Sequence, residues 1–297
     1  MDEEHKTRIS LPARMQKLGP EDACVVQIYG GELGKRYSIT GELTVGRDAT
    51  NSIVLDMDNV SRRHACFFLD DDVGYVEDLG STNGTFINDQ DIQSRQQLRN
   101  GDLIKVGGAI FKFISGGNVE GLYHEEIYRM TIIDGLTQIY NKRYFKDFLE
   151  REMARCSRYG SDLALALFDI DHFKKLNDTY GHLAGDHVLH KLAQLVAKRV
   201  RREELLARYG GEEFALVLPE TNLERATHLG EEVRALVEAE TFLFDGEEIK
   251  TTLSLGIATM TGEIEPLEFI KLADEALYEA KGNGRNRVVA HSSLRGD

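Results

Sequence analysis

Two adjacent glutamates at a predicted turn are the residues of this sequence whose position is most typical of chemistry. Glu212 and Glu213 follow a pair of glycines, and short apolar runs lie at 205–207 and 214–218. Glycine permits the positive φ of a tight turn, so the segment predicts a β-hairpin. Neighbouring carboxylates repel each other and contribute nothing to a core. Two interpretations stay open: a solvated acidic turn, or a site for a cation that carries a polyphosphate.

A third carboxylate is expected beside this turn. Asp169 follows the apolar run 163–168, which is typical of a buried strand, and sites in α/β sheets often lie at strand ends. Asp169 and Glu212, aided by the Ile170 carbonyl, would form a hard-oxygen site suited to Mg²⁺. Lys174 and the first amides of the following helix suit a polyphosphate.

Two further groups have alternative explanations. Asn177 and Asp186 would select guanine, because a carboxylate accepts from its N–H groups and an amide both donates and accepts; otherwise they cap a helix and face solvent. Lys281 and Arg285 either clamp phosphates or form the basic end of a helix. The four histidines between 172 and 190 lack the closed spacing of a zinc site, so we expect them on ordinary helix faces.

An α/β domain must position these groups. Helices are expected at 141–159, with Asn141 as N-cap, and at 171–180, 182–200, 222–239 and 266–281. Strands are expected at 163–168, 205–208, 214–218, 248–259 and 287–290. The order predicts a central, partly antiparallel sheet with helices packed against it.

The first part of the chain has a different pattern. Short strands separated by Gly, Asn and Asp predict an all-β sandwich, with strands at 24–29, 36–39, 43–45, 53–55, 64–69, 74–78, 85–87, 102–106 and 109–114. We expect a flexible tail at 1–20, the sandwich at 21–115, a linker at 116–133 and the α/β domain at 134–297. Residues 119–133 have helical periodicity, for a helix that either packs on a neighbouring domain or dimerises.

Loops of the predicted sandwich contain the forked cations, hydroxyls and amides that bind a phosphate. The segments GR at 46–47, SRRH at 61–64 and STNGT at 81–85 resemble the forkhead-associated (FHA) family, whose β-sandwiches bind phosphothreonine peptides. The resemblance implies that the phosphate is bound by Arg47 and Ser61, assisted by Arg62 and Thr82, and that Asn83 holds the peptide main chain. It implies structural roles for Gly46 and His64. A degenerate, purely structural FHA domain is the alternative.

The tail before the sandwich contains one candidate phosphosite. Thr7 lies in a basic stretch with Lys6, Arg8, Arg14 and Lys17. Phosphorylated Thr7 would have a high effective concentration at the FHA pocket of its own chain or of a second copy. A separate phosphoprotein is the alternative partner.

Seven segments of the α/β domain resemble the GGDEF family of diguanylate cyclases: DGLT at 134–137, NKR at 141–143, FDIDHFKKLND at 168–178, YGHLAGD at 180–186, RYGGEEF at 208–214, SLG at 254–256 and ADEALY at 273–278. Members condense two GTP molecules to cyclic di-GMP and pyrophosphate, on a fold like the palm of nucleotide cyclases. The resemblance covers about residues 134–291.

The resemblance also implies roles for single residues. It places Mg²⁺ on Asp169, the Ile170 carbonyl and Glu212. It places guanine at Asn177 and Asp186 with His182 nearby, the phosphates at Phe173 and Lys174, and the terminal phosphates at Lys281 and Arg285. Lys174 would stabilise the transition state and Glu213 would deprotonate the 3′-hydroxyl. Asp134 and Arg208 are expected to form a structural ion pair.

Two departures from the family pattern affect these expectations. Glu212 occupies the third position of the turn motif, where the family more often has Asp, and this change keeps the carboxylate and the enzyme interpretation. Arg201 and Glu204 lie at the spacing of the family's Arg-x-x-Asp product site. We expect inhibition by product there, and the alternative is a solvated charge run. Each domain holds one GTP, so catalysis requires a homodimer with facing sites.

Composition limits the remaining function classes. The net charge is −14, and neither residues 1–117 nor residues 118–297 carry a basic excess, which argues against polymeric nucleic acid as partner. Three scattered cysteines predict no disulfide framework. Without a signal-like apolar core or a run of about 18 apolar residues, we expect a cytoplasmic protein with no membrane span. An inactive-cyclase sensor of cyclic di-GMP or GTP, and an FHA scaffold, are the alternative functions.

Overall fold

The computed structural model describes residues 23–115, 127–260 and 262–291. The chain divides into two compact units, Met1–Thr131 and Ile132–Asp297, which are described separately. The expected tail, with Thr7, and residues 119–126 of the expected linker helix lie outside the described residues. Residues 127–132, at the end of that linker, are helical.

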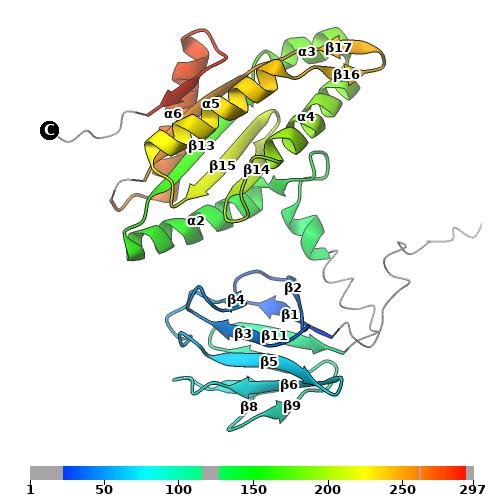
Figure 1. The fold of residues 1–297 in the computed structure, drawn as a ribbon, viewed down its shortest axis with the longest axis vertical. Helices are drawn as coiled ribbons and strands as arrows, with labels where there is room; N and C mark the ends of the chain where they lie inside the picture. Colours follow the sequence, from blue (N-terminus) through cyan, green and yellow to red (C-terminus); the bar gives the residue numbers. More distant parts are fainter. Residues whose placement is uncertain (1–22, 116–126, 261, 292–297) are drawn as a thin grey trace, which may run out of the picture. The chain divides into compact units, whose positions relative to one another are not determined.

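The first unit is a sandwich of two β-sheets (Figure 1). Its strands are β1 (Cys24–Tyr29), β2 (Arg36–Ser38), β3 (Leu43–Gly46), β4 (Ile53–Val54), β5 (Ala65–Asp70), β6 (Val73–Asp78), β7 (Thr85–Ile87), β8 (Gln90–Asp91), β9 (Gln96–Gln97), β10 (Leu103–Val106) and β11 (Ala109–Ile114). One sheet has the order β2-β1-β11-β10-β7-β8 and the other β4-β3-β5-β6-β9. The predicted all-β sandwich is therefore confirmed.

The sandwich core lies between the two sheets. Val25, Phe67 and Phe111 are fully buried in one cluster, and the rings of Phe67 and Phe111 meet edge to face at 6.0 Å. The short strands β8 and β9 were not predicted, because two-residue polar strands have no apolar alternation. Three inter-strand loops, those after β3, before β5 and after β6, contain the predicted phosphate-binding residues.

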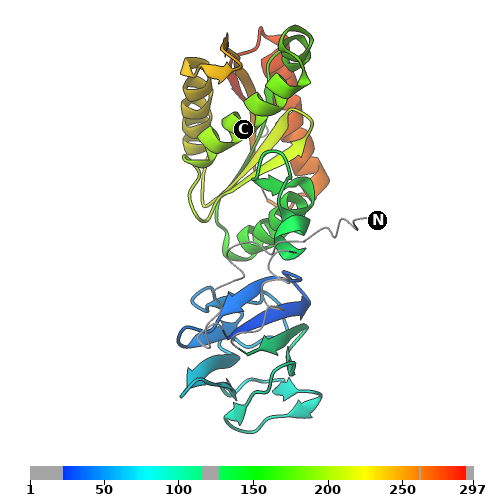
Figure 2. The same cartoon turned by 90° about the vertical axis from the view of Figure 1, so that its right-hand side faces the viewer.

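The second unit is a six-stranded sheet with helices on both faces (Figure 2). Its sheet strands are β12 (Tyr140–Asn141), β13 (Leu163–Ile170), β14 (Leu205–Gly210), β15 (Glu213–Pro219), β18 (Leu253–Thr259) and β19 (Val288–Ala290). A separate hairpin consists of β16 (Phe242–Phe244) and β17 (Glu247–Ile249). The helices are α2 (Lys142–Tyr159), α3 (Phe173–Tyr180), α4 (His182–Ala197), α5 (Leu223–Ala239) and α6 (Pro266–Gly282). The sheet order is β12-β14-β15-β13-β18-β19.

Strand β13 lies in the middle of this sheet and is antiparallel to both neighbours, β15 and β18. All eight of its residues are buried. Its even-numbered residues, such as Phe168, belong to the core beneath α4 and α5. Its odd-numbered residues, such as Leu167, belong to the core beneath α2 and α6. The continuous apolar run in the sequence thus reflects burial on both faces, and Asp169 is directed toward the α6 face.

Most of the predicted elements are present, but strands β12 and β16 were not predicted, and the helix predicted at 182–200 ends at Ala197. Two further predictions are corrected. The single strand predicted at 248–259 is two strands, β17 and β18, because Thr251 and Thr252 interrupt it. The helix predicted from Asp171 begins at Phe173, because His172 has a left-handed backbone with φ of 58°. Asn141 caps α2 as predicted, since its side chain accepts a hydrogen bond from the Tyr144 amide.

The structure also addresses the predictions about the cysteines and about membrane-spanning helices. Cys24, Cys66 and Cys156 are buried and form no disulfide, as expected from their spacing. Within 23–115, 127–260 and 262–291, no helix combines the length and apolar character needed to cross a bilayer.

Candidate functional sites

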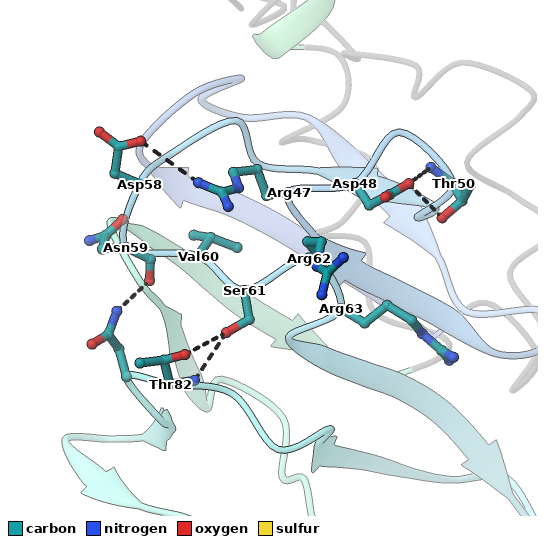
Figure 3. Close-up of a pocket in the computed structure, with 11 residues that line it drawn as sticks. Arg47, Asp48, Thr50, Asp58, Asn59, Val60, Ser61, Arg62, Arg63 and Thr82 are labelled. Atoms are coloured by element: carbon teal, nitrogen blue, oxygen red, sulfur yellow. Dashed lines mark hydrogen bonds and ion pairs between the residues drawn. The ribbon is translucent and has the colours of Figure 1, made fainter.

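The loops at one end of the β-sandwich form an open pocket of about 630 Å³ (Figure 3). All five predicted phosphate-site residues line it. The full lining is Arg47, Asp48, Thr50, Asp58, Asn59, Val60, Ser61, Arg62, Arg63, Thr82 and Asn83. Figure 3 shows Arg63 extending away from Ser61 and Thr82, so it is less suited than Arg62 to a ligand bound at these hydroxyls.

The groups that could bind a phosphate in this pocket are two hydroxyls and the guanidinium groups of Arg47 and Arg62. Ser61 Oγ accepts a hydrogen bond from the Thr82 amide at 3.0 Å and lies 3.4 Å from Thr82 Oγ1. The Arg47 guanidinium lies 3.8 Å from Asp58, whose side chain is fully exposed. A surface ion pair of this kind contributes little free energy. A dianionic phosphate would therefore compete well for Arg47.

A buried histidine braces these loops. His64 Nδ1 accepts a hydrogen bond from the Ser61 amide at 3.2 Å, so the neutral ring carries its proton on Nε2, which lies 3.1 Å from the Gly84 carbonyl oxygen. The imidazole thus joins the Ser61 loop to the Thr82 loop. Asn83 donates a hydrogen bond to the Asn59 carbonyl oxygen at 2.9 Å and so lies at the pocket rim. The predicted structural role of His64 agrees with these contacts.

In the second unit, strand register brings two of the predicted carboxylates together. Asp169 on β13 pairs directly with Glu213 on β15, and the two-residue turn Gly211–Glu212 joins β14 to β15. Gly211 has a φ of +51°, which favours glycine there. Hairpin and strand end therefore meet as the sequence predicts.

A lysine from α6 completes this cluster. Lys281 Nζ lies 2.9 Å from Asp169 Oδ2. Burial raises the pKa of Asp169 to about 6; Lys281 opposes the rise, and the charges of Glu212 and Glu213 add to it. The raised pKa indicates that one ammonium group does not compensate for the burial of Asp169 and the charges of the two glutamates.

These groups fit a divalent cation. The oxygens of Asp169 and Glu212 are hard ligands, and the Lys281 ammonium already occupies the position of a cation against Asp169. Ile170, whose carbonyl was the third predicted ligand, is the last residue of β13. In the described part of the chain, no three His, Cys, Asp or Glu side chains group as a metal site. A metal here would therefore take its other ligands from backbone, water and phosphate, which is the usual coordination of Mg²⁺.

The predicted guanine-binding residues lie on two adjoining helices. Asn177 is on α3, and Asp186 is exposed on α4. Asn177 Oδ1 is buried and, among the described residues, receives no hydrogen bond. It lies against Gly185, where an added Cβ would be 1.9 Å away. An unsatisfied buried acceptor is expected where a ligand supplies the donor.

The remaining phosphate residues surround the same end of the sheet. Phe173 and Lys174 begin α3, directly after the turn that follows β13, and Lys174 is exposed. Arg285 follows α6 and has a left-handed backbone with φ of 61°. His182 is exposed at the start of α4. Phe173 and Lys174 thus follow the end of β13, Arg285 follows the end of α6 that contacts Asp169, and His182 begins the helix that packs on α3.

Two ion pairs lie outside this cluster. Arg208 Nη1 lies 3.1 Å from Asp134 Oδ1, so the predicted structural pair is present. Glu204 accepts a hydrogen bond from the Arg201 amide at 2.8 Å, and its side chain is 5% exposed, against 74% for Arg201. The carboxylate of the predicted product site therefore bonds within its own turn, while the arginine extends into solvent.

Sequence reasoning assigned no role to Asp171. Its buried carboxylate accepts hydrogen bonds from Thr252, Ser254 and Asn286. The available signal was its spacing of two residues from Asp169, which puts both on one face of an extended strand. The partners are 81 or more residues away in sequence and no local pattern predicts them.

Comparison with known families and proteins agrees with this geometry. The family described as "Diguanylate cyclase, GGDEF domain" matches residues 131–287, and the family described as "FHA domain" matches residues 43–107. The chain is 44% identical over 164 residues to diguanylate cyclase DgcP of Pseudomonas aeruginosa, which covers 55% of this chain and 24% of DgcP. It spans less than half the length of the curated relatives that it matches.

Solved structures resemble the second unit. The GGDEF domain of DgcB from Caulobacter crescentus, determined in complex with c-di-GMP, has a TM-score of 0.54 and 36% identity, covering 55% of this chain and 94% of that one. The active GGEEF domain of a diguanylate cyclase from Vibrio cholerae has a TM-score of 0.50 and 34% identity, covering 53% of this chain and all of that one.

Proposed function

Because the chain belongs to the GGDEF family of diguanylate cyclases, we propose that its second unit condenses two GTP molecules into cyclic di-GMP and two pyrophosphates. The observation that carries this proposal is the meeting of Asp169, Glu213 and Lys281 at one end of the sheet. Acidic groups for a metal and a cation for phosphate then lie within one cluster. A triphosphate with its metal matches that combination.

Substrate binding is proposed to use the groups around β13. Asn177 and Asp186 bind the guanine edge, with His182 nearby, and the buried Asn177 oxygen receives a donor that the protein does not supply. Phe173, Lys174 and the first amides of α3 contact the phosphates. Lys281 and Arg285 bind the terminal phosphates, where their charges oppose those of the triphosphate.

The chemical step is proposed to join two bound nucleotides. The 3′-oxygen of one GTP forms a bond to the α-phosphorus of the other, the bond from that phosphorus to the oxygen that bridges to the β-phosphate breaks, and pyrophosphate leaves. The reciprocal attack by the 3′-oxygen of the second nucleotide closes the ring and releases the second pyrophosphate. Glu213 accepts the hydroxyl proton, and Lys174 stabilises the charge of the transition state. Asp169, the Ile170 carbonyl and Glu212 would hold Mg²⁺, which would offset phosphate charge and lower the pKa of the hydroxyl.

Two copies of the chain are required by this chemistry. One unit has one set of guanine and phosphate groups, so the second GTP is held by a second unit that faces the first. We therefore propose a homodimer as the catalytic form. Analytical ultracentrifugation of the full chain with 3′-deoxy-GTP, which lacks the attacking hydroxyl, would detect that dimer. A strictly monomeric but active protein would contradict the proposal.

The cyclase proposal is tested by incubating the full chain with GTP and Mg²⁺ and separating the products by chromatography. We expect cyclic di-GMP from the unsubstituted protein. Glu213→Gln should abolish product and keep the binding of 3′-deoxy-GTP. Glu247→Gln, an exposed change on β17, is the matched control and should leave product formation unchanged. Guanine nucleotide binding without product would support the sensor alternative instead.

For the first unit, we propose that the pocket binds a phosphothreonine peptide. Its support is the grouping of Arg47, Ser61, Arg62 and Thr82 around one open pocket (Figure 3). The phosphate would replace Asp58 at Arg47 and accept hydrogen bonds from the hydroxyls, while Asn83 holds the peptide main chain. Ser61→Ala should lower the affinity for a phosphothreonine peptide about tenfold, the loss of one hydrogen bond to a charged group. Arg63→Ala is the control, because that side chain extends away from the hydroxyls.

The peptide is proposed to be the chain's own tail or a segment of a separate phosphoprotein. Phosphorylated Thr7 would dock in its own pocket or in that of a second copy, at the high effective concentration of a tethered ligand. Phosphorylation should then weaken the binding of an added phosphothreonine peptide, and Thr7→Ala should restore it. Equal binding by the phosphorylated protein and the Thr7→Ala protein would rule out self-docking.

Product is proposed to bind at Arg201 and Glu204. Arg201 extends into solvent and can stack on guanine or bind phosphate, whereas Glu204 must leave the Arg201 amide to contact a ligand. Inhibition is therefore expected to be weak. Arg201→Ala should remove the slowing of product formation that added cyclic di-GMP causes. If the variant and the unsubstituted protein are inhibited equally, product acts elsewhere.

A further inference from the structure

Asp171 is the most heavily hydrogen-bonded carboxylate at this end of β13. Its Oδ2 accepts hydrogen bonds from Thr252 Oγ1 at 2.6 Å and from the Asn286 amide at 3.0 Å. Its Oδ1 accepts one from Ser254 Oγ at 2.6 Å. The residue is only 5% exposed. Three donors from two distant segments thus converge on one buried side chain.

These contacts give Asp171 a different environment from that of Asp169, although only one residue lies between them in the sequence. A carboxylate has about four acceptor positions, and three of those of Asp171 are occupied by protein donors. Asp169, in contrast, contacts a cationic side chain, Lys281, and faces Glu213 across the sheet. The two aspartates therefore have different partners: Asp169 is suited to a cation, and Asp171 to backbone and hydroxyl donors.

The segment that Asp171 holds is backbone of unusual conformation. Gly284, Arg285 and Asn286 all have positive φ, at 104°, 61° and 46°. For a residue with a side chain such a backbone costs on the order of 1 kcal/mol or more, so surrounding contacts must maintain it. The Asn286 side chain adds two such contacts, because it accepts from Arg234 at 2.9 Å and donates to Glu238 at 2.7 Å.

Both ends of this basic segment are attached to the end of β13. Lys281, at the end of α6, contacts Asp169, and Asn286, next to Arg285, contacts Asp171. We propose that Asp171 is a positioning residue, whose hydrogen bond from the Asn286 amide holds Lys281 and Arg285 where they bind the terminal phosphates of GTP. This inference rests on the proposed function, which assigns the terminal phosphates to these two cations.

A comparison of two nucleotides tests this role in the full chain. Binding of 3′-deoxy-GTP, which cannot turn over, depends on the terminal phosphates, whereas binding of GMP does not. Asp171→Ala should lower the affinity for 3′-deoxy-GTP about tenfold, the loss of roughly one hydrogen bond to a charged group, and change the affinity for GMP less than twofold. A purely structural role would weaken both nucleotides equally, and that result would overturn the proposal.

Two further variants make the test specific. Ser254→Ala removes one bond to the same carboxylate and leaves the Asn286 contact, so it should keep the preference for the triphosphate. Asp171→Asn keeps an oxygen for the Asn286 amide and removes the charge, so it should retain the preference and the Mg²⁺ dependence of binding. If Asp171→Ala does not fold, Asp171→Asn alone still tests the proposal. Loss of the preference for 3′-deoxy-GTP over GMP, or of the Mg²⁺ dependence of binding, in that variant would contradict positioning by hydrogen bonding.

The outcomes separate this inference from the cyclase proposal. If the unsubstituted chain prefers 3′-deoxy-GTP to GMP but forms no cyclic di-GMP from GTP, the cyclase proposal fails and the role of Asp171 is still measured. If product forms but Asp171→Ala weakens both nucleotides alike, the inference fails alone. If the unsubstituted chain binds the two nucleotides equally, no terminal-phosphate site exists and the inference is wrong.

Discussion

Replacing Asp169 by asparagine should stabilise the metal-free protein while destroying its proposed activity. Asp169 is 8% exposed, and its pKa is raised from the ordinary value of 3.8 to about 6, mainly by burial. At 1.36 kcal/mol for each tenfold change, keeping this carboxylate ionised in the folded protein costs roughly 3 kcal/mol at neutral pH. An amide avoids that cost, and the attraction of Lys281 is already included in the pKa of about 6. The net gain in the free energy of unfolding should be roughly 3 kcal/mol at pH 7.5.

The raised pKa of Asp169 also predicts how the stability of the protein changes with pH. The folded carboxyl binds its proton more tightly than the unfolded one, so the stability of the unsubstituted protein falls as pH rises from about 4 to about 6 and is constant above. Asp169→Asn lacks this dependence. Its advantage should be full at pH 7.5 and about half as large at pH 5. Urea unfolding in EDTA measures it, with helical circular dichroism as the signal, because α2–α6 all belong to the second unit.

Asp134→Asn is a matched control, for which the expected change in stability has the opposite sign. Asp134 is also part-buried, but hydrogen bonds from Thr137 and the charge of Arg208 outweigh burial and lower its pKa. Asp134→Asn should therefore destabilise the second unit at pH 7.5. Added Mg²⁺ should raise the stability of the unsubstituted protein and not that of Asp169→Asn. An Asp169→Asn protein no more stable than its parent at pH 7.5 in EDTA would refute the reasoning from burial and carboxylate repulsion.

Other substitutions test separate parts of the structure. Gly185→Ala places a Cβ 1.9 Å from Asn177 Oδ1, so the affinity for 3′-deoxy-GTP, measured by calorimetry, should fall about tenfold or more, with a stability loss of roughly 1–3 kcal/mol. Asp78→Asn should lower the stability of the β-sandwich by about 1 kcal/mol at pH 7, because hydrogen bonds to Asp78 outweigh burial and lower its pKa. This loss should shrink as pH falls below 3.8, as measured by hydrogen exchange of β5 and β6. Asn141→Ala should cost about 1 kcal/mol in helical unfolding, the value of an N-cap.

The sequence predicted the end of the second unit where Asp169 and the hairpin meet, because the information there is local. A run of eight buried residues defines β13, and the glycine pair defines the hairpin that brings Glu213 opposite Asp169. Periodicity and turn chemistry are sufficient for this much. They did not predict that Lys281 contacts Asp169, which requires α6 to cover the face toward which Asp169 points.

Several features that the sequence did not predict depend on tertiary packing. Asn286 reaches Asp171 across 115 residues, and nothing in either segment encodes the other. The start of α3 was misplaced because a left-handed His172 depends on the tertiary path after β13. The Glu204 carboxylate was predicted to face a ligand, whereas the structure bonds it to the Arg201 amide three residues earlier. Charge and spacing define which groups are available, and packing decides which of them pair.

The position of β13 has a consequence for how such a protein can be regulated. A strand that is paired along both edges and covered on both faces has no low-energy local motion, so its amides should exchange with deuterium only when the whole unit unfolds. Chemistry attached to such a strand is not readily switched by bending it. In the proposed dimeric mechanism, control would act instead on how often, and in which orientation, two copies with bound GTP meet. The first unit, if it binds a phosphopeptide as proposed, would change that frequency and leave every residue of β13 in place.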